Sequence, residues 1–427
     1  MAPTGHTLAR ERLSAWLHRH GPASAPDAAR ALGVSPATLL RMLQERPDVL
    51  AAGQARRRRY ALRRSLRGEG EAWPVYAIGR DGRAELAGTL SLVAPEGSHL
   101  AWNEAAWPAP EEQRDGWWPG LPYPVVDMRP QGYMGRRFAR RHAASLRIDP
   151  DPRRWSDEEA LLAMLRAGSD LSGNLVVGRE ALAQWQQSRL APPEAVAGEQ
   201  RGARYVALAE QSLDEGEAGS SAGGEFPKFT ARRIRPGAAT PHVLVKFSGA
   251  EDSAAVRRWS DLLVCEHLAL EALPAAGVPA ARSEVLCHGG RTFLEVERFD
   301  RHGEHGRSPL VSLEAVDAAF VGTAAGRWPQ AVEALQRTGL LTADDAARVR
   351  RQWWFGRLIR NTDMHPGNLS FEPEGARLRP SPAYDMLPMC HAPLPGGEVP
   401  ERSFDAPLPA PEERDDWFAA LPAALGF

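Results

Sequence analysis

The sequence predicts an α+β protein built from more than one structural unit. At 427 residues the chain is long for a single hydrophobic core, and its length suggests two to four units. Helical spacing of apolar residues opens the chain and recurs near its end, whereas short alternating runs typical of strands occupy much of the middle. The charged and apolar fractions, 25% and 43%, are those of an ordinary globular protein.

Several features bear on the compartment. No run of about 18 apolar residues occurs, so no membrane span is expected. The first residues lack the basic-then-apolar order of a signal peptide. The three cysteines, Cys265, Cys287 and Cys390, lie far apart, which argues for a reducing compartment and against a disulfide framework or a structural zinc. We therefore expect a cytoplasmic protein.

The basic residues are distributed unevenly in two ways. Residues 1–65 hold twelve Arg against four Asp or Glu, so a segment of net charge +8 precedes a remainder of −10, which suggests that this part meets a polyanion. In addition, only two of the 52 basic residues are lysines, Lys228 and Lys246. A compact ammonium binds phosphate as a point charge, and both lysines lie in candidate phosphate-binding segments.

Residues 1–66 are predicted to form a winged helix-turn-helix unit. Helical patterns cover 7–20 and 26–32, and Ser35 is expected to cap a third helix. Two short helices joined by a glycine-containing turn form a helix-turn-helix, and residues 49–62 suit a hairpin wing.

The third helix and the wing carry the expected DNA contacts. Leu39, Leu40 and Leu43 are expected to face inward, and residues 29–41 resemble many bacterial winged helix-turn-helix repressors. Polar and basic side chains then face outward toward bases and phosphates: Thr38, Arg41, Gln44, Arg56, Arg57, Arg58 and Arg59. A helical protein-interaction unit with a solvated arginine run is the alternative interpretation.

Strand patterns follow in the middle of the chain. Residues 75–90 alternate in short runs around an Asp-Gly pair, which predicts a hairpin. A loop rich in Pro and Trp spans about 107–124, and Ser156 with Glu159 predicts a capping box for a helix over 155–165. This stretch has no evident catalytic constellation, so its aromatic residues are expected in the core.

A glycine-rich segment, 220–229, reads Ser-Ser-Ala-Gly-Gly-Glu-Phe-Pro-Lys-Phe. Gly223 and Gly224 would let the backbone approach a ligand, and consecutive N–H groups can bind an anion. The segment is not a Walker A loop, and a flexible linker has a similar composition.

A buried strand is predicted next, over 242–247, and it carries Lys246. A strand-borne Lys after a glycine-rich loop is how kinases place an ammonium on the α- and β-phosphates. Glu266, on a helix predicted over 259–273, is the hypothetical ion-pair partner of Lys246. A further strand over 292–301 leads into a polar segment.

The most informative polar residues follow a helix predicted over 342–360. Asp363 and Asn368 stand five positions apart, and Asp385 lies downstream in a Tyr-Asp pair. Phosphoryl transfer on ATP requires this order, because the first Asp can accept a hydroxyl proton while Asn and the second Asp hold Mg²⁺. Mg²⁺ prefers hard oxygen ligands and needs few of them from protein. The alternative is a polar loop of ordinary turn residues.

Taken in order, these motifs resemble the HipA-like kinases, the toxin halves of bacterial type II toxin–antitoxin systems. The resemblance starts at about residue 73, and the DNA-binding unit in front is typical of the longer YjjJ-type (HipH) branch. It rests on the glycine-rich segment, the strand with Lys246, Val-Glu-Arg-Phe-Asp-Arg, Asn-Thr-Asp-Met-His-Pro-Gly-Asn and Pro-Ala-Tyr-Asp. It implies a two-lobed kinase fold, with a β-rich N-lobe over 70–300 and a helical C-lobe over 301–427.

The resemblance also implies Mg²⁺- and ATP-dependent phosphorylation of protein Ser or Thr. Asp363 matches the catalytic base, His365 the loop histidine near the phosphates, and Asn368 and Asp385 the metal ligands. The implied ATP-binding residues are Ser221, Gly223, Gly224, Lys228, Lys246, Glu297 and Phe299. Ser221 matches a serine whose autophosphorylation inhibits related kinases, and the adjacent Ser220 leaves the register open. A phosphate there would compete with those of ATP for the same donors.

Two departures from the family pattern stand out. Gly367 occupies a position where relatives often carry Lys. Typical toxins of the family rely on a separate DNA-binding antitoxin, whereas here a DNA-binding unit is on the same chain, and we expect residues 1–66 to do the operator-binding part of the antitoxin's task. The expected partners are a protein substrate, such as the aminoacyl-tRNA synthetases that some relatives modify, and operator DNA; binding to a palindromic site would imply a homodimer. The rival interpretations are a transcription regulator whose kinase-like domain transfers no phosphate, and a kinase acting on a small molecule.

Overall fold

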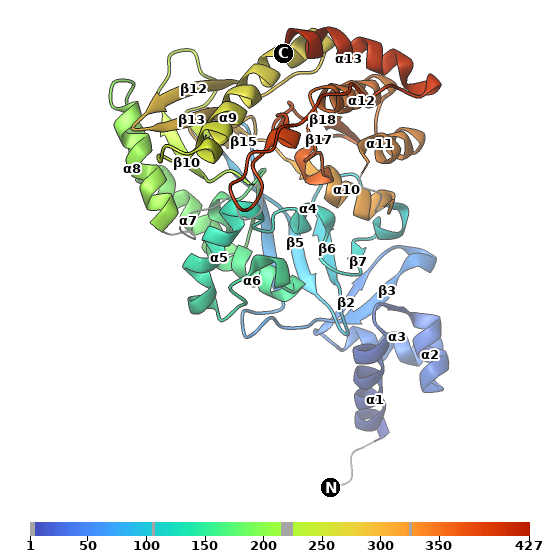
Figure 1. The fold of residues 1–427 in the computed structure, drawn as a ribbon. Helices are drawn as coiled ribbons and strands as arrows, with labels where there is room; N and C mark the ends of the chain where they lie inside the picture. The colour runs from blue at the N-terminus through green and yellow to red at the C-terminus, as the bar shows by residue number, and fades with distance from the viewer. Residues whose placement is uncertain (1–4, 105–106, 215–224, 324–326) are drawn as a thin grey trace.

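The computed structural model describes residues 5–104, 107–214, 225–323 and 327–427. Figure 1 shows the N-terminal helices at one end of the molecule, a strand-rich middle region next to them, and a second sheet and a group of helices at the far end. The fold is α+β and two-lobed, as predicted, with the second sheet and the C-terminal helices on opposite sides of one cleft.

Residues 5–62 form three α-helices and a three-stranded antiparallel sheet of order β1-β3-β2. These elements are α1 (Gly5–His20), β1 (Ala23–Ser24), α2 (Ala25–Leu32), α3 (Pro36–Gln44), β2 (Val49–Ala52) and β3 (Arg59–Leu62). The Ser35 hydroxyl accepts the Thr38 N–H at 3.2 Å, so the predicted cap of α3 is confirmed.

One prediction for α3 was wrong. Leu40 is 41% exposed, whereas Met42 is 6% exposed and packs with Leu39 and Leu43 in the core of this unit. Residues three and four positions apart share a helix face, and the buried face of α3 therefore runs through 39, 42 and 43.

The β2–β3 hairpin is docked against the middle region. Leu50 and Ala61 of the hairpin pack with Val93 and Trp117, and the Ala94 N–H donates to the Leu62 carbonyl at 3.0 Å. This apolar contact and the shared backbone bonding connect the N-terminal unit directly to the neighbouring sheet.

The middle sheet has five antiparallel strands in the order β7-β6-β5-β4-β8. They are β4 (Ala72–Ile78), β5 (Ala84–Leu92), β6 (Ser98–Trp102), β7 (Trp117–Trp118) and β8 (Leu175–Val177). The predicted hairpin is the β4–β5 pair, and Gly82 in its turn has φ +75°, a conformation that favours glycine. The predicted capping box of Ser156 and Glu159 opens α6 (Asp157–Ala167).

Three further helices complete the middle region, α4 (Tyr123–Val126), α5 (Gly132–Leu146) and α7 (Arg179–Leu190). Its aromatic residues are largely buried, as predicted, including Trp73, Trp117 and Trp155.

The second sheet also has five strands, in the order β12-β13-β11-β10-β9. They are β9 (Ala195–Val196), β10 (Lys228–Arg233), β11 (His242–Phe247), β12 (Ser283–His288) and β13 (Arg291–Glu297), and the helices α8 (Arg201–Asp214) and α9 (Ala254–Ala272) pack against them. Helix α9 begins earlier than predicted, because Ser253 caps it by accepting the Val256 N–H.

The C-terminal part is mainly helical. It contains β14 (Arg301–His302), β15 (Gly306–Arg307), β16 (Val311–Ser312), α10 (Leu313–Phe320), α11 (Trp328–Arg337), α12 (Ala343–Leu358), β17 (Ser370–Glu374), β18 (Arg377–Pro380) and α13 (Arg414–Gly426). Val349, Trp353 and Leu358 of α12 are buried.

A single hydrophobic cluster joins the middle sheet to the C-terminal helices, with Leu90 and Trp73 in the same cluster as Phe355. The second sheet has separate clusters, around Phe247 and around Leu263. The domain boundaries 1–66, 70–300 and 301–427 remain predictions. In the described ranges, no helix combines the length and apolar character needed to cross a membrane.

Candidate active site

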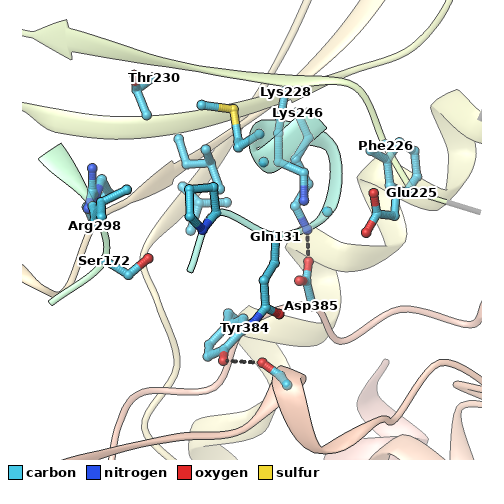
Figure 2. A pocket seen from close by; sticks show the side chains of 18 of the residues that line it. Gln131, Ser172, Glu225, Phe226, Lys228, Thr230, Lys246, Arg298, Tyr384 and Asp385 are labelled. Atoms are coloured by element: carbon cyan, nitrogen blue, oxygen red, sulfur yellow. Dashed lines mark hydrogen bonds and ion pairs between the residues drawn. The ribbon is translucent and has the colours of Figure 1, made fainter. Parts of the chain in front are cut away.

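A cavity of about 680 Å³ lies between the second sheet and the C-terminal part. Its size is that of a small-molecule site. Figure 2 shows Lys228 and Lys246 entering it from the sheet, with Tyr384 and Asp385 on the opposite side. Asp363, His365, Gly367 and Asn368 line the same cavity, so the structure brings the predicted polar residues together.

Lys246 is a buried charge of this site, with a side chain 4% exposed. Its ammonium donates to both carboxylate oxygens of Glu266, at 2.7 and 2.8 Å, and also contacts the Asp385 carboxylate. Glu266, on α9, is 1% exposed, and the ion pair predicted for these two residues is therefore present. Burial lowers the pKa of Lys246, and the negative charge of Glu266 opposes that shift.

The pairing of β10 with β11 explains why both lysines reach one place. Lys228 and Lys246 are directly opposite each other in this antiparallel pair, so their side chains lie on the same face of the sheet. Two ammonium groups on one wall suit a ligand with several negative charges.

The loop after α12 is held in place by Asn361, a buried residue that the sequence analysis did not single out. Its amide oxygen accepts the Asp363 N–H at 3.0 Å, and its amide nitrogen donates to the Asp385 carbonyl at 3.2 Å. Asn368 in turn donates its amide N–H to the Asp363 carbonyl at 2.8 Å. These bonds connect Asp363, Asn368 and Asp385 into one unit. Residues 361–368 form the candidate catalytic loop, called the catalytic loop below.

The Asp363 side chain is accessible from the cavity. Partial burial raises the pKa of this carboxyl, while His365 and the two lysines act in the opposite direction and Glu225 adds to the rise. A carboxylate with a raised pKa holds an accepted proton better, which is the property that a general base needs.

His365 lies over Gly367. Its Nδ1 accepts the Gly367 N–H at 3.1 Å, so the ring's hydrogen, when the ring is neutral, is on Nε2. A Cβ added at Gly367 would lie 2.8 and 2.9 Å from His365 ring atoms, which is too close. Glycine at this position is therefore required by the present placement of the histidine ring.

Tyr384 and Asp385 close the opposite side of the cavity. Asp385 has φ +54°, an uncommon conformation for a residue with a side chain and one that often marks a functional position. The Tyr384 hydroxyl donates to the Gly367 carbonyl at 3.0 Å and lies 2.7 Å from the Ser370 hydroxyl.

The residues predicted on the adenine side also line the cavity. Phe299 packs against Tyr384 with ring centroids 5.7 Å apart, and Glu297 pairs with Arg235. Ser220, Ser221, Gly223 and Gly224 lie outside the described residues.

The middle region supplies a third wall, which the sequence analysis missed. Gln131 extends toward Tyr384 and Asp385, and Ser172 lies near Arg298 at the other end of the cavity (Figure 2). Asp127 and residues of α5 also line it. No motif marks these positions; the arginine run of α5 was the only local signal.

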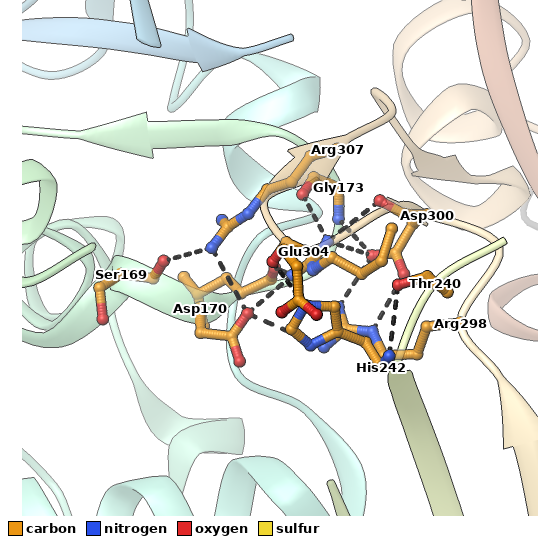
Figure 3. A network of polar contacts seen from close by, with 11 residues as sticks. Ser169, Asp170, Gly173, Thr240, His242, Arg298, Asp300, Glu304 and Arg307 are labelled. Atoms are coloured by element: carbon orange, nitrogen blue, oxygen red, sulfur yellow. Dashed lines mark hydrogen bonds and ion pairs between the residues drawn. The ribbon is translucent and has the colours of Figure 1, made fainter. Parts of the chain in front are cut away.

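A network of charged groups connects this third wall to the segment after β13 (Figure 3). Arg301 donates to Asp170 and to Asp300 at 2.8 and 2.7 Å, and Arg298 forms a bidentate pair with Asp300. Desolvation by neighbouring groups favours the protonated form of Asp170, but the surrounding arginines prevail and lower its pKa to about 2. The network fixes the strand end that carries Glu297 and Phe299.

Asn368 and Asp385 fit the donor set of Mg²⁺. Donation from the amide nitrogen of Asn368 leaves its oxygen for a cation, and Asp385 adds a carboxylate, so both offer the hard oxygen ligands that Mg²⁺ prefers. The parts of the chain that the structure describes contain no group of three or more His, Cys, Asp or Glu residues suited to a metal ion.

The predicted DNA contacts lie far from this cavity, on the N-terminal unit (Figure 1). Arg41 and Gln44 on α3 are exposed and Thr38 is partly exposed. Arg56, Arg58 and Arg59 are exposed, whereas Arg57, also exposed, pairs with Asp115 at 2.9 Å and donates to the Glu111 carbonyl.

The fold and the cavity define a kinase-like protein with a lysine–glutamate pair beside a polar loop. Residues 69–186 match the middle domain of YjjJ-like toxins, and residues 220–407 match the HipA-like C-terminal domain. The chain is 38% identical to Toxin YjjJ of Escherichia coli (strain K12) over 408 residues, which are 95% of this chain and 89% of that protein. The chain belongs to the HipA-like toxin family, in its YjjJ branch.

Two solved structures are partly similar. One is HipA of Shewanella oneidensis MR-1 in a complex with HipB and operator DNA, with 16% identity, coverage of 74% of this chain and 76% of that chain, and a TM-score of 0.48. The other is the Helicobacter pylori proinflammatory kinase CtkA, with 13% identity, coverage of 39% and 54%, and a TM-score of 0.29. The family assignment rests on the sequence matches.

Proposed function

We propose that this protein is a toxin kinase that transfers the γ-phosphoryl group of ATP to a serine or threonine hydroxyl of a protein. The observation that carries the proposal is the convergence of Lys246, Asp363, Asn368 and Asp385 on one cavity, with Lys246 held by Glu266. These groups come from both lobes and match the parts that phosphoryl transfer needs.

We assign each of these groups a role from its position in the cavity. Lys246 and Lys228 bind the phosphate groups, and Glu266 keeps the Lys246 ammonium charged and oriented. Asp363 accepts the proton of the serine or threonine hydroxyl. The oxygen of that hydroxyl bonds to the γ-phosphorus, and ADP leaves. Mg²⁺, when bound by Asn368 and Asp385, offsets negative charge on the phosphates. Glu297 and Phe299 are assigned to the adenine end of the cavity.

Transfer of label from ATP tests this proposal. Wild type is expected to label itself or an added cellular protein fraction, and Asp363→Asn is expected to lose about 10²–10⁴-fold in rate, the usual contribution of a general base. Asp81→Asn, a change of the same kind on the exposed β4–β5 turn, is the matched control. A labelled small molecule would support the small-molecule kinase instead, and no transfer at all would support a regulator that only binds nucleotide.

We further propose that Ser221, or the adjacent Ser220, is an inhibitory autophosphorylation site. A phosphate in this segment would compete with ATP for Lys228 and Lys246. Phosphosite mapping of the expressed wild type and of Asp363→Asn checks it: label at either serine in the wild type alone supports the assignment, and label elsewhere contradicts it.

A DNA-binding function in cis is proposed for residues 1–66. It is supported by the net charge of +8 and by the exposure of Arg41, Arg56 and Arg58 around a helix-turn-helix and hairpin. The related Shewanella HipA was solved with HipB and operator DNA, which fits a DNA partner. A palindromic operator would bind two copies of the chain.

Fluorescence anisotropy of the full chain with the duplex upstream of its own gene tests this function, with random duplex as the reference. Loss of each phosphate-contacting arginine is expected to reduce the slope of log affinity against log salt by about 1. Arg58→Ala is the variant, and Arg83→Ala is its control, because Arg83 is 82% exposed in the turn between β4 and β5. Equal affinity for both duplexes at physiological salt would contradict specific operator binding.

A further inference from the structure

We infer that Asp127, in the middle region, is a positioning residue for the catalytic loop. The inference rests on the proposed kinase function and assigns a role to a residue in a region without a recognisable catalytic motif. Asp127 ends α4 and lines the cavity, but it belongs to none of the phosphate-, metal- or adenine-binding groups described above.

The first link joins Asp127 to Ser312, 185 positions later in the chain. The Asp127 carboxylate accepts the Ser312 backbone N–H at 3.0 Å and also accepts the Ser312 hydroxyl hydrogen. Because the hydroxyl donates to Asp127, its oxygen lone pairs remain for the Ala315 N–H, which it accepts as the N-cap of α10. Asp127 thus fixes both the backbone and the side chain at the β16–α10 junction.

The second link joins Ser312 to the catalytic loop. Ser312 pairs with Ser370 across β16 and β17, and the Leu313 N–H donates to the Leu369 carbonyl at 2.7 Å. Residue 369 directly follows Asn368, the last residue of the loop. The junction that Asp127 holds is therefore hydrogen-bonded to the backbone that leaves the loop.

The third link passes through side chains. The Tyr384 hydroxyl has one hydrogen and donates it to the Gly367 carbonyl, so the Ser370 hydroxyl must be the donor in its 2.7 Å contact with Tyr384. Ser370 thereby orients Tyr384, and Tyr384 holds Gly367, next to Asn368 and two positions after His365. The chain of contacts runs from Asp127 through Ser312, Ser370 and Tyr384 to the loop.

The test compares rates and affinities in the full-length protein. Asp127→Asn is expected to lower the rate of label transfer at saturating ATP by about tenfold. This is the lower end of the roughly 10- to 100-fold loss typical when a residue that orients metal ligands is replaced. The ATP concentration giving half the maximal rate should change by less than about twofold, since the phosphate-binding residues are untouched. Ser312→Ala should lower the rate similarly, and Ser312→Thr, which keeps a hydroxyl, should restore it.

Asp157→Asn is the matched control. Asp157 lies in the same region and binds the Leu121 N–H and Arg129, but it has no link to Ser312. Its substitution should leave the rate unchanged. Tyr384→Phe combined with Asp127→Asn should be no slower than the slower single variant, because both act through one chain of contacts. Multiplicative losses, or an unchanged rate in Asp127→Asn, would overturn the inference.

Amide hydrogen exchange provides a readout that does not depend on catalysis. In Asp127→Asn, the amides of Asn368 and Leu369 are expected to exchange faster than in wild type, while those of α12 keep their rates. If the wild type transferred no phosphate, the proposed function would fail, yet faster exchange at these amides would still support the link to the loop. Unchanged exchange there would overturn the inference whatever the activity.

Discussion

The two five-stranded sheets have the same number of strands but bury different side chains. The second sheet buries Lys246 and Glu295, at 4% and 2% exposure. The strands of the middle sheet, all within the described residues, bury no Asp, Glu, Lys or Arg; their buried polar residues are Ser91, Ser98 and His99. Buried charges are costly unless they are paired, so the second sheet depends on the ion pairs of Lys246 with Glu266 and of Glu295 with Arg233, which have no counterpart in the strands of the middle sheet.

The largest expected effect concerns the charge on β11. Lys246→Met removes the partner of a buried Glu266 carboxylate and should cost about 3–5 kcal/mol in the free energy of unfolding, together with nearly all label transfer. Urea denaturation and label transfer measure the two losses. Arg83→Met, at an exposed position in the turn between β4 and β5 of the middle sheet, should change neither. Retention of full activity by Lys246→Met would remove the functional distinction between the sheets.

The next effect concerns the apolar core of the middle sheet. Leu90 is fully buried, so Leu90→Ala should cost about 2–5 kcal/mol in the free energy of unfolding. At temperatures below the unfolding transition, the ATP concentration that gives half-maximal transfer should stay the same, because Leu90 is not among the residues that line the cavity. Urea denaturation at 15 °C measures the loss of stability, and the transfer assay at the same temperature measures the ATP concentration at half-maximal rate. A large change in ATP affinity would mean that the middle sheet also shapes the nucleotide site.

Asp127 offers a pH-dependent comparison, since it is a carboxylate that the middle region contributes to the cleft. Burial raises its pKa from 3.8 to about 6, against the effect of the Ser312 bonds. The folded state therefore favours the protonated acid, and this contribution is present below about pH 4 and is lost as the pH rises through about 6. The free energy of unfolding of wild type relative to Asp127→Asn should fall by up to about 3 kcal/mol between pH 4 and pH 7. Urea denaturation at each pH checks it, and a flat difference would contradict the raised pKa.

The smallest expected effect is at the start of α6. Ser156→Ala removes the hydroxyl that caps this helix and should cost about 1 kcal/mol without altering transfer rates. A thermal melt detects the change. Ser156→Thr, which keeps a capping hydroxyl, should retain most of the stability; equal loss in both variants would argue against the cap as the cause.

Local spacing accounts for most of what could be predicted from the sequence. The strand with Lys246, the helix with Glu266 and the loop from Asp363 to Asn368 each follow from short patterns, and the structure brings them to one cavity. Asn361 and Asp127 escaped prediction because their roles depend on partners 24 and 185 positions away, which no local pattern encodes. The same holds for Asp170, which meets Arg301 131 positions later.

Leu40 shows a different cause. Three leucines in a short helix fit more than one helical phase, and the buried face was decided by packing against α1 and α2, which favoured Met42. In such cases the pattern identifies the helix but leaves its rotation open.

The docked β2–β3 hairpin sets the geometry of any complex on DNA. Leu50 and Ala61 contact Val93 and Trp117, and Arg57 pairs with Asp115, so the N-terminal unit and the cleft keep a fixed mutual orientation. A chain bound through α3 would hold the mouth of its cavity at one angle and distance from the helix axis of the duplex. If the proposed kinase binds DNA in this way, it would phosphorylate only proteins that lie on the side of the duplex that its cavity faces.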